Sequence, residues 1–488
     1  MKRSFVYICC AGLFAALPGC KKYLEKEPDN RTNITSPAQI GQLLTSAYPK
    51  GNYILFCEAM SDNVEDRGVA GVGLDFADRI NAQSYRFQVV EDVPDDIDGP
   101  TNYWNSCYKA IAVANQALEI IRNSPDSTSL SAYKGEALLA RAYAHFMLVT
   151  LFSKPYNPVS SSSDPGIPFV TEPETETFKT YERKTVSFVY EMVEKDLTEG
   201  YPLINDQIYT SAPRFHFNKR AAAAFAARFY LFKQDYSQVV SYATTALGTS
   251  VVENLRPWNT VLTNLQYAEL EVEYTKSTTE GNLLLQEAAS IWGRYHPSFR
   301  FGLGPNLAQK IFFTDNVSGG FYAYDLYGTT QAFNLPKFSE YFVRENLNAN
   351  SGIPYNTIPL LTGEEALLNR AEAYLRLNNN NAALADLNSF ASENIDEYDP
   401  TAHRITASKA STFYNTSSAT GILNAILDFK QAFFLLEGLR WFDIIRLGIP
   451  VQHVTSEGEV IQVLPDDNRR VLQLPVTTRI AGLEPNPR

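Results

Sequence analysis

Apolar side chains recur at spacings of three and four residues along much of this 488-residue chain. That spacing puts them on one face of an α-helix, so each such stretch predicts a helix that buries a stripe of its surface. Pro37 stands at the start of the first stretch, where its missing N–H costs nothing. The pattern predicts helices over residues 37–48, 101–121, 132–152, 186–200, 218–234 and 236–247.

Two segments match a helix-turn-helix repeat. Residues 226–247 and 370–390 place small, aromatic and aliphatic residues where a tetratricopeptide repeat needs them. The run Thr-Gly-Glu-Glu at 362–365 is typical of a capping box. Because a helix pair buries its apolar face only against a neighbour, we expect about four packed pairs, two clear and two degenerate. The sequence predicts an all-α, tetratricopeptide-like scaffold with repeat helices over about 101–247 and 362–448.

Two regions interrupt this helical pattern. Residues 52–99 and about 250–359 are rich in Gly, Pro, Asn and Asp with mixed aromatics, which predicts long irregular loop insertions and short strands. Binding residues usually lie on ordered loops that a rigid scaffold positions. We therefore expect one domain over residues 37–488, with its ligand region at about 250–359.

The N-terminus has the layout of a secretory signal. Lys2 and Arg3 precede an apolar segment, residues 5–17, that is too short to span a membrane. Gly19 and Cys20 then follow a proline. This order resembles a bacterial lipobox, although that proline departs from the usual small or aliphatic residue. The alternative is an ordinary signal peptide cleaved nearby.

The lipobox resemblance implies that residues 1–19 are removed and that Cys20 is acylated. Residues 20–36 would then be a polar tether. No later stretch approaches the roughly 18 uninterrupted apolar residues that a spanning helix needs. We therefore expect the lipid to be the only attachment to the membrane.

Charge and cysteine content narrow the partners further. The formal net charge is −12, and it becomes −14 once Lys2 and Arg3 leave with the signal. That acidity argues against nucleic acid as a partner. Cys57 and Cys107 remain, and outside the cytoplasm they could form a disulfide or stay as two buried thiols.

The stretch of residues 436–448 narrows the function most. Its apolar residues form a helical stripe, while Glu437, Arg440 and Asp443 stand three apart on a neighbouring face. We expect an ion-pair ladder beside a buried Trp441, a structural role rather than a catalytic one. The string resembles the closing helix signature of the SusD/RagB family of outer-membrane nutrient-binding lipoproteins.

The resemblance extends over most of the chain. Residues 135–156, 216–236 and 471–487 are similar to that family's first long repeat helix, its central helix and its closing segment, in the same order. The chain stops soon after Pro487, where members often continue with a glycine and an aromatic residue.

Membership implies a lipid-anchored outer-membrane protein on the cell surface. Such a protein would bind a nutrient glycan, an oligo- or polysaccharide, and deliver it to a SusC-like TonB-dependent transporter. Two alternatives stay open. One is a peptide ligand, and the other is a tetratricopeptide-type scaffold that holds a protein partner.

The sequence offers no basis for an enzyme. Nucleophile-elbow, zinc-protease, phosphate-loop and dinucleotide motifs are missing, and the histidines lack ligand spacing. We therefore expect no catalytic residue, no cofactor and no metal. The acidic residues near Asp96 could hold calcium. More simply, they could complement the dipole of the helix that begins near Thr101.

An aromatic-rich segment is the candidate ligand surface. Residues 292–342 hold 14 aromatic residues, against 12% aromatic content for the whole chain, set among glycines. Flat rings beside hydrogen-bonding groups are a common way to hold sugars. We predict an exposed saccharide platform formed by Trp292 and Tyr295, with Trp258 and Tyr322 as weaker members.

A second wall is predicted from residues 61–67 and from two charged residues shortly after them. The 61–67 loop is rich in Asp, Asn, Glu and Arg, and Asp75 and Arg79 come next. These side chains could hydrogen-bond a saccharide. We include Asp75 and Arg79 among the expected ligand residues.

Overall fold

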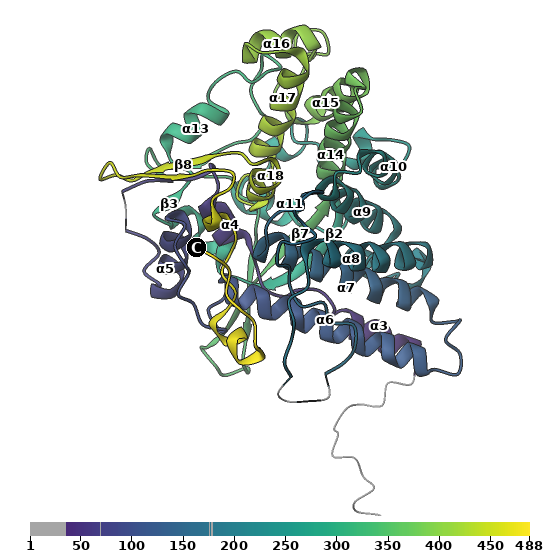
Figure 1. Ribbon diagram of the computed structural model, residues 1–488. Helices are drawn as coiled ribbons and strands as arrows, with labels where there is room; N and C mark the ends of the chain where they lie inside the picture. Colours follow the sequence, from purple (N-terminus) through teal and green to yellow (C-terminus); the bar gives the residue numbers. More distant parts are fainter. Residues whose placement is uncertain (1–35, 69, 175, 177–178) are drawn as a thin grey trace, which may run out of the picture.

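Long helices packed side by side build most of the molecule (Figure 1). The computed structural model describes residues 36–68, 70–174, 176 and 179–488. The first group of neighbouring helices is α3 (Pro37–Leu44), α6 (Pro100–Asn123), α7 (Ser131–Phe152) and α8 (Val186–Gly200). The predictions for the three long members are confirmed to within a few residues, whereas the first short helix ends at Leu44, before residue 48.

A second group of helices continues the same packing. α10 packs against both α9 and α14, although more than 100 residues separate α10 from α14. The all-α scaffold of repeated helix pairs is therefore confirmed. The members are α9 (Lys219–Lys233), α10 (Tyr236–Leu247), α14 (Gly363–Arg376), α15 (Asn380–Asn394), α16 (Ala407–Tyr414), α17 (Ser418–Phe433) and α18 (Leu439–Leu447).

The two interrupting regions contain more helix than we expected. All residues of α4 (Ile54–Met60) are buried, so the helix has no amphipathic period for sequence reading to detect. The other helices in these regions are α5 (Asp75–Tyr85), α11 (Tyr267–Tyr274), α12 (Trp292–Tyr295) and α13 (Pro305–Phe312). Except for α5, they are eight residues or shorter, which also weakens a periodic signal.

Short antiparallel sheets complete the fold. β2 (Asn282–Ala289) pairs with β7 (Gly352–Thr362), and β6 (Glu340–Arg344) pairs with the other side of β7 as an edge strand. β7 leads directly into α14, so this sheet is fixed to the repeats. Two-stranded pairs join β1 (Glu65–Asp66) to β3 (Phe301–Gly302), β4 (Tyr327–Gly328) to β5 (Phe333–Asn334), and β8 (Val451–Val454) to β9 (Val460–Val463).

Helix α18 carries the signature stretch. Trp441 is buried as predicted. The predicted ion-pair ladder is wrong for Glu437 and Arg440, because Glu437 pairs with Lys337 and Arg440 with Asp62. Asp443 pairs with Lys430 and, within the helix, with a further arginine three residues on. Glu437 and Arg440 therefore bind distant elements, and Asp443 binds both α17 and an arginine of its own helix.

The predicted capping box at residues 362–365 is formed only in part. The Thr362 hydroxyl accepts from the Glu365 N–H, as expected for an N-cap. The Glu365 carboxylate turns away from the cap and binds the buried Arg228 of α9. A tertiary ion pair between two repeats has taken the place of the local hydrogen bond.

The structure also bears on the two cysteines and on possible membrane-spanning helices. Cys57 and Cys107 are both free and buried, so the thiol alternative holds in this structure. Across the described ranges, no helix is both long and apolar enough to cross a bilayer. Cys20 and most of the expected tether lie outside the described residues.

Candidate functional site

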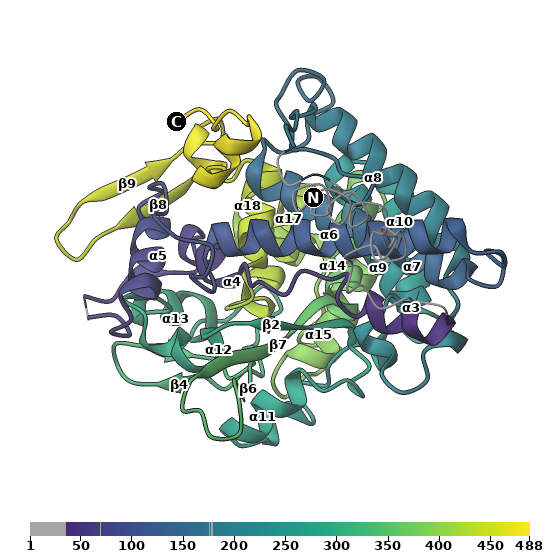
Figure 2. The same ribbon diagram turned by 90° about the horizontal axis from the view of Figure 1, so that it is seen from below.

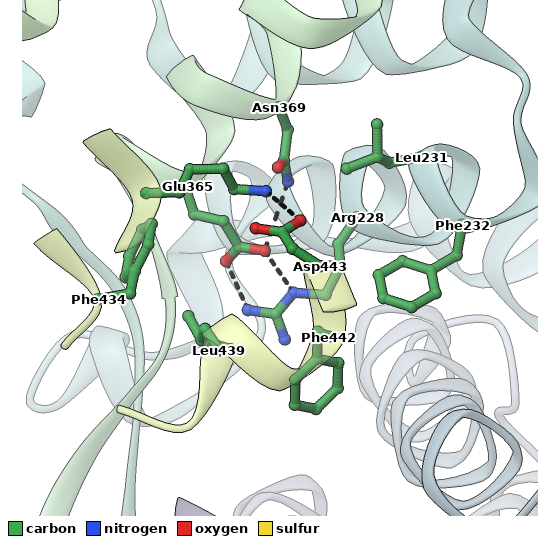
Figure 3. A pocket seen from close by; sticks show the side chains of 10 residues that line it. Arg228, Leu231, Phe232, Glu365, Asn369, Phe434, Leu439, Phe442 and Asp443 are labelled. Carbon is green, nitrogen blue, oxygen red and sulfur yellow. Dashed lines mark hydrogen bonds and ion pairs between the residues drawn. The ribbon is translucent and has the colours of Figure 1, made fainter. Parts of the chain in front are cut away.

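One enclosed cavity lies between α9, α14, α17 and α18 (Figure 3). Its volume of about 20 Å³ admits little more than one water molecule. The Arg228–Glu365 and Lys430–Asp443 pairs line it, and the Arg228 Nη1 and Asn369 Oδ1 atoms there have no protein partner. The cavity fits a buried water that completes these hydrogen bonds, and it excludes a saccharide.

The two predicted loop walls meet elsewhere, beside β3. β1 pairs with β3 in the register Glu65 to Gly302 and Asp66 to Phe301. Figure 1 shows β3, α5 and α13 on the same side as the β8–β9 hairpin. We call residues 62–67 and 294–310, with the side chains that pair with them, the loop seam.

Asp66 is the centre of hydrogen bonding in the loop seam. Arg300 donates to both of its carboxylate oxygens, each at 2.8 Å, and the Ser456 and Gly68 N–H groups donate as well. Burial alone would raise the pKa of Asp66, but these donors hold it well below its usual range. Arg300 also reaches Glu457 at 3.0 Å and remains one third exposed. A charged pair with free donor capacity therefore lies at the surface.

Two further carboxylates belong to the loop seam, Glu65 and Asp62. Glu65 accepts from the backbone and side-chain nitrogens of Asn306 at 2.9 and 3.0 Å. Arg440 donates two parallel hydrogen bonds to Asp62, at 2.7 and 2.8 Å. Burial would raise the pKa of Asp62, and Arg440 lowers it. Each acid is thus held in a fixed orientation.

Packing beneath the loop seam makes it rigid. The Tyr85 ring stacks between Phe301 and His453, with ring centroids 4.1 Å away on each side. Arg67 is buried and donates to the Pro297 and Phe299 carbonyls. The loop backbone is therefore fixed by side chains from three separate parts of the chain, as a binding surface requires.

Aromatic side chains and an ion pair lie in and next to the second segment of the loop seam. The Arg294 guanidinium lies over the half-buried Tyr295 ring, 5.6 Å from its centroid, and it also pairs with Glu340 of β6. Phe313 is 47% exposed and contacts Phe333 edge-on. β5, which contains Phe333, packs against residues 296–298, directly after Tyr295. Figure 2 shows α12, α13, β4 and β6 on one side, away from α7 and α8.

Trp292, the leading predicted platform residue, is not exposed. Only 4% of its surface is accessible, its Nε1 donates to the Leu436 carbonyl at 3.0 Å, and its ring stacks on Phe299. The expectation of an exposed ring is therefore wrong. The glycine-rich loop folds back over the segment before α18, so its aromatic residue joins the core. Contact between Tyr295 and a ligand stays a prediction.

Trp258 and Tyr322 are buried for a related reason. The Trp258 ring is 1% exposed and contacts Tyr324 edge-on at 4.6 Å. Tyr322 stacks on the other side of the same cluster, 5.3 Å from Tyr324. Their predicted exposure is wrong, because irregular segments here carry aromatics into a core between the loops and α17.

Asp75 and Arg79 lie on α5, near the loop seam but not within it. Asp75 is exposed in the first turn of the helix, and Arg79 pairs with Asp96 at 3.2 Å.

The acidic stretch before α6 contacts the start of that helix. Asp92 accepts from both the N–H and the hydroxyl of Thr101. The acidic stretch thus assists the start of that helix. Among the described residues, no cluster of metal-ligating side chains occurs there or elsewhere.

Sequence reasoning missed the pairs that organise the loop seam. Arg300 and Asp66 are 234 residues apart, and Arg440 and Asp62 are 378 apart. No local spacing indicates such partners. What the arrangement offers is a fixed set of acceptors and donors beside two partly exposed rings, which is suited to binding a polyhydroxylated ligand.

Comparison by sequence identifies one family. Residues 22–231 match a SusD-like family that is described as starch-binding and associating with the outer membrane. No curated protein matches.

Solved structures share the fold across nearly the whole chain. A SusD superfamily protein from Bacteroides thetaiotaomicron is 20% identical, with a TM-score of 0.67, over 93% of this chain and 100% of that one. A putative sugar binding protein from Bacteroides vulgatus is 19% identical, with a TM-score of 0.67, over 93% and 99%. A laminarin binding SusD-like protein is 16% identical, with a TM-score of 0.56, over 92% and 99%.

Proposed function

We propose that this chain belongs to the SusD/RagB family and is a cell-surface lipoprotein that captures a nutrient glycan, and the family match of residues 22–231 and the shared fold support this proposal. In this proposal the glycan passes unchanged to a SusC-like TonB-dependent transporter in the outer membrane. The protein supplies binding, and no covalent step is part of its role.

The observation that carries this proposal is the loop seam. It contains hydrogen-bonding pairs, including Arg300–Asp66, and the Arg294–Tyr295 group, and the exposed Phe313 follows it closely in the chain. Sugars present an apolar C–H face and a rim of hydroxyls, so rings next to fixed donors and acceptors complement them. The sugar-binding and laminarin-binding descriptions of two similar structures support the same class of ligand.

A combined glycan and peptide array tests the ligand class. The mature chain, beginning after residue 19, should bind a subset of the glycans and none of the peptides. Binding to peptides alone would replace the glycan by a peptide ligand while leaving the rest of the proposal in place.

The anchor is tested separately through Cys20. Cys20→Ala should give a folded protein that is released from the membrane fraction, because the lipid is the only proposed attachment. The test needs a strain that lacks the transporter partner, since a bound transporter would retain the protein. If the variant still fractionates with outer membranes in that strain, lipidation at Cys20 is wrong.

An open groove between α6, α7 and α8 favours a second candidate, a scaffold for a protein partner. The groove has a volume of about 780 Å³, with apolar residues such as Leu118, Leu138 and Met192 along it. A protease added to intact cells distinguishes the two. A surface glycan receptor should be degraded, whereas a scaffold facing the periplasm would be shielded.

A further inference from the structure

The exposed cations of the loop seam are already engaged with carboxylates. Arg300 holds Asp66 and Glu457, at 2.8 and 3.0 Å. Arg294, whose side chain is 54% exposed, holds Glu340. These are the arginines that an anionic ligand would meet first, and each is neutralised before the ligand arrives.

The neighbouring cations also interact with carboxylates. Arg440 is committed to Asp62 through two parallel hydrogen bonds. Lys310 is exposed, and it interacts favourably with the charged forms of both Asp62 and Asp428. Glu65 accepts from the neutral amide of Asn306 and interacts favourably with the charged form of the buried Arg67.

Carboxylates therefore outnumber cations at the loop seam. The cations are the buried Arg67 together with Arg294, Arg300, Lys310 and Arg440, and the carboxylates, one more in number, are Asp62, Glu65, Asp66, Glu340, Asp428 and Glu457. The whole chain is acidic as well, with a net charge of −12. An exposed Arg344 exists, but it lies at the far end of β6 from Glu340.

The charge of the sugar should therefore decide whether it binds at the loop seam. A uronate or sulfated sugar would have to break an existing arginine pair or approach an excess of carboxylates, and both cost free energy. Uncharged hydroxyls meet no such obstacle, because they can donate to the carboxylates and accept from the remaining arginine N–H groups.

We infer that the loop seam takes an uncharged oligo- or polysaccharide and rejects uronate and sulfated chains. This inference rests on the proposed glycan-binding function and adds a substrate class to it.

Matched polysaccharides test the inference. Binding of the mature protein is measured at about 50 mM salt, where screening is weak, to dextran and dextran sulfate, laminarin and its sulfated form, and hydroxyethyl and carboxymethyl cellulose. We expect binding to at least one uncharged member, about tenfold or more tighter than to its anionic partner. Equal or tighter binding to an anionic member overturns the inference and leaves glycan binding intact. If none of the six binds, the glycans retained on the array decide: uncharged glycans support the inference, uronate or sulfated glycans overturn it, and no retained glycan at all contradicts glycan binding itself.

Releasing the arginines tests the cause. The double variant Glu340→Gln with Glu457→Gln frees Arg294 and leaves Arg300 with Asp66 as its one remaining carboxylate, so the affinity preference for the uncharged member should narrow by roughly threefold or more. The double variant Glu182→Gln with Glu273→Gln removes the same two charges outside the loop seam, from the exposed partners Lys184 and Lys276, so it is the matched control and should leave the preference unchanged. If the control narrows it equally, net charge alone is responsible and the inference is wrong.

Discussion

The repeats and the loop seam use the same kind of ion pair in opposite surroundings. Arg256 and Glu364, where a loop meets α14, form a pair at 2.8 Å with both side chains 0% exposed. Arg294 and Glu340 at the loop seam pair while the arginine stays largely in solvent. A buried pair fixes how elements pack, and removing one member leaves an uncompensated charge. An exposed pair contributes little to stability and keeps polar atoms available for a ligand.

Aromatic residues divide in the same way. Trp441 and Trp292 are buried against the elements around α18, whereas Tyr295 is only half-buried and Phe313 is largely exposed. Residue type therefore does not predict which aromatic side chains are exposed to solvent here. What distinguishes a ligand ring from a core ring is whether another part of the chain already covers it.

The largest expected effect tests whether Trp292 belongs to the core. Trp292→Ala should lower the free energy of unfolding by about 3 to 5 kcal/mol, as should Trp441→Ala, because each removes a large buried side chain. Chemical denaturation of both variants measures this. If Trp292→Ala kept the wild-type stability but lost glycan binding, the ring would belong to the site and the division between the two regions would fail.

The two classes of ion pair can be compared directly. Glu364→Gln should cost about 3 kcal/mol of stability, because it leaves Arg256 charged and fully buried. Glu340→Gln makes the same chemical change at the loop seam and should cost less than about 1 kcal/mol. Equal costs in urea unfolding would show that exposure does not separate these pairs.

A smaller effect is expected at Glu271 of α11, and it depends on pH. Burial raises the pKa of Glu271 from 4.5 to about 7. The folded chain then holds this proton more tightly than the unfolded chain, so the stabilisation is present below pH 4.5 and is lost as the pH rises through about 7. Glu271→Gln stays neutral, so at pH 8 it should be more stable than wild type by about 1 kcal/mol, allowing for solvent at this half-exposed site.

Unfolding measured at pH 4.5 and at pH 8 checks this prediction. The two proteins should be nearly equal in stability at the lower pH. A constant difference at both values would mean that the carboxyl does not titrate as described.

The helical scaffold could be predicted because its information is local. Residues 186–200 and 236–247 have the helical period, and α8 and α10 occupy those bounds. α4 was missed because it is buried all round, which erases the period. The ladder expected among Glu437, Arg440 and Asp443 did not form, because Lys337, Asp62 and Lys430 supply partners from other elements.

The proposed binding surface was predicted only as a region. The composition of residues 61–67 and 292–327 marked both walls, and the β1–β3 pairing brings them together. Which rings face solvent depends on how the loops fold over α17 and α18, and composition does not determine that. Trp292 was selected for its type and is covered, whereas Phe313 was not selected and is exposed.

Titration calorimetry with Tyr295→Ala tests the central claim, that the loop seam binds the glycan. The probe is whichever of the six matched polysaccharides binds wild type best. We predict at least a tenfold loss of affinity, about 1.4 kcal/mol, with the free energy of unfolding nearly unchanged. Tyr398→Ala, which alters another half-buried tyrosine in the loop before α16, should keep wild-type affinity. Wild-type affinity in a folded Tyr295→Ala protein would contradict the claim.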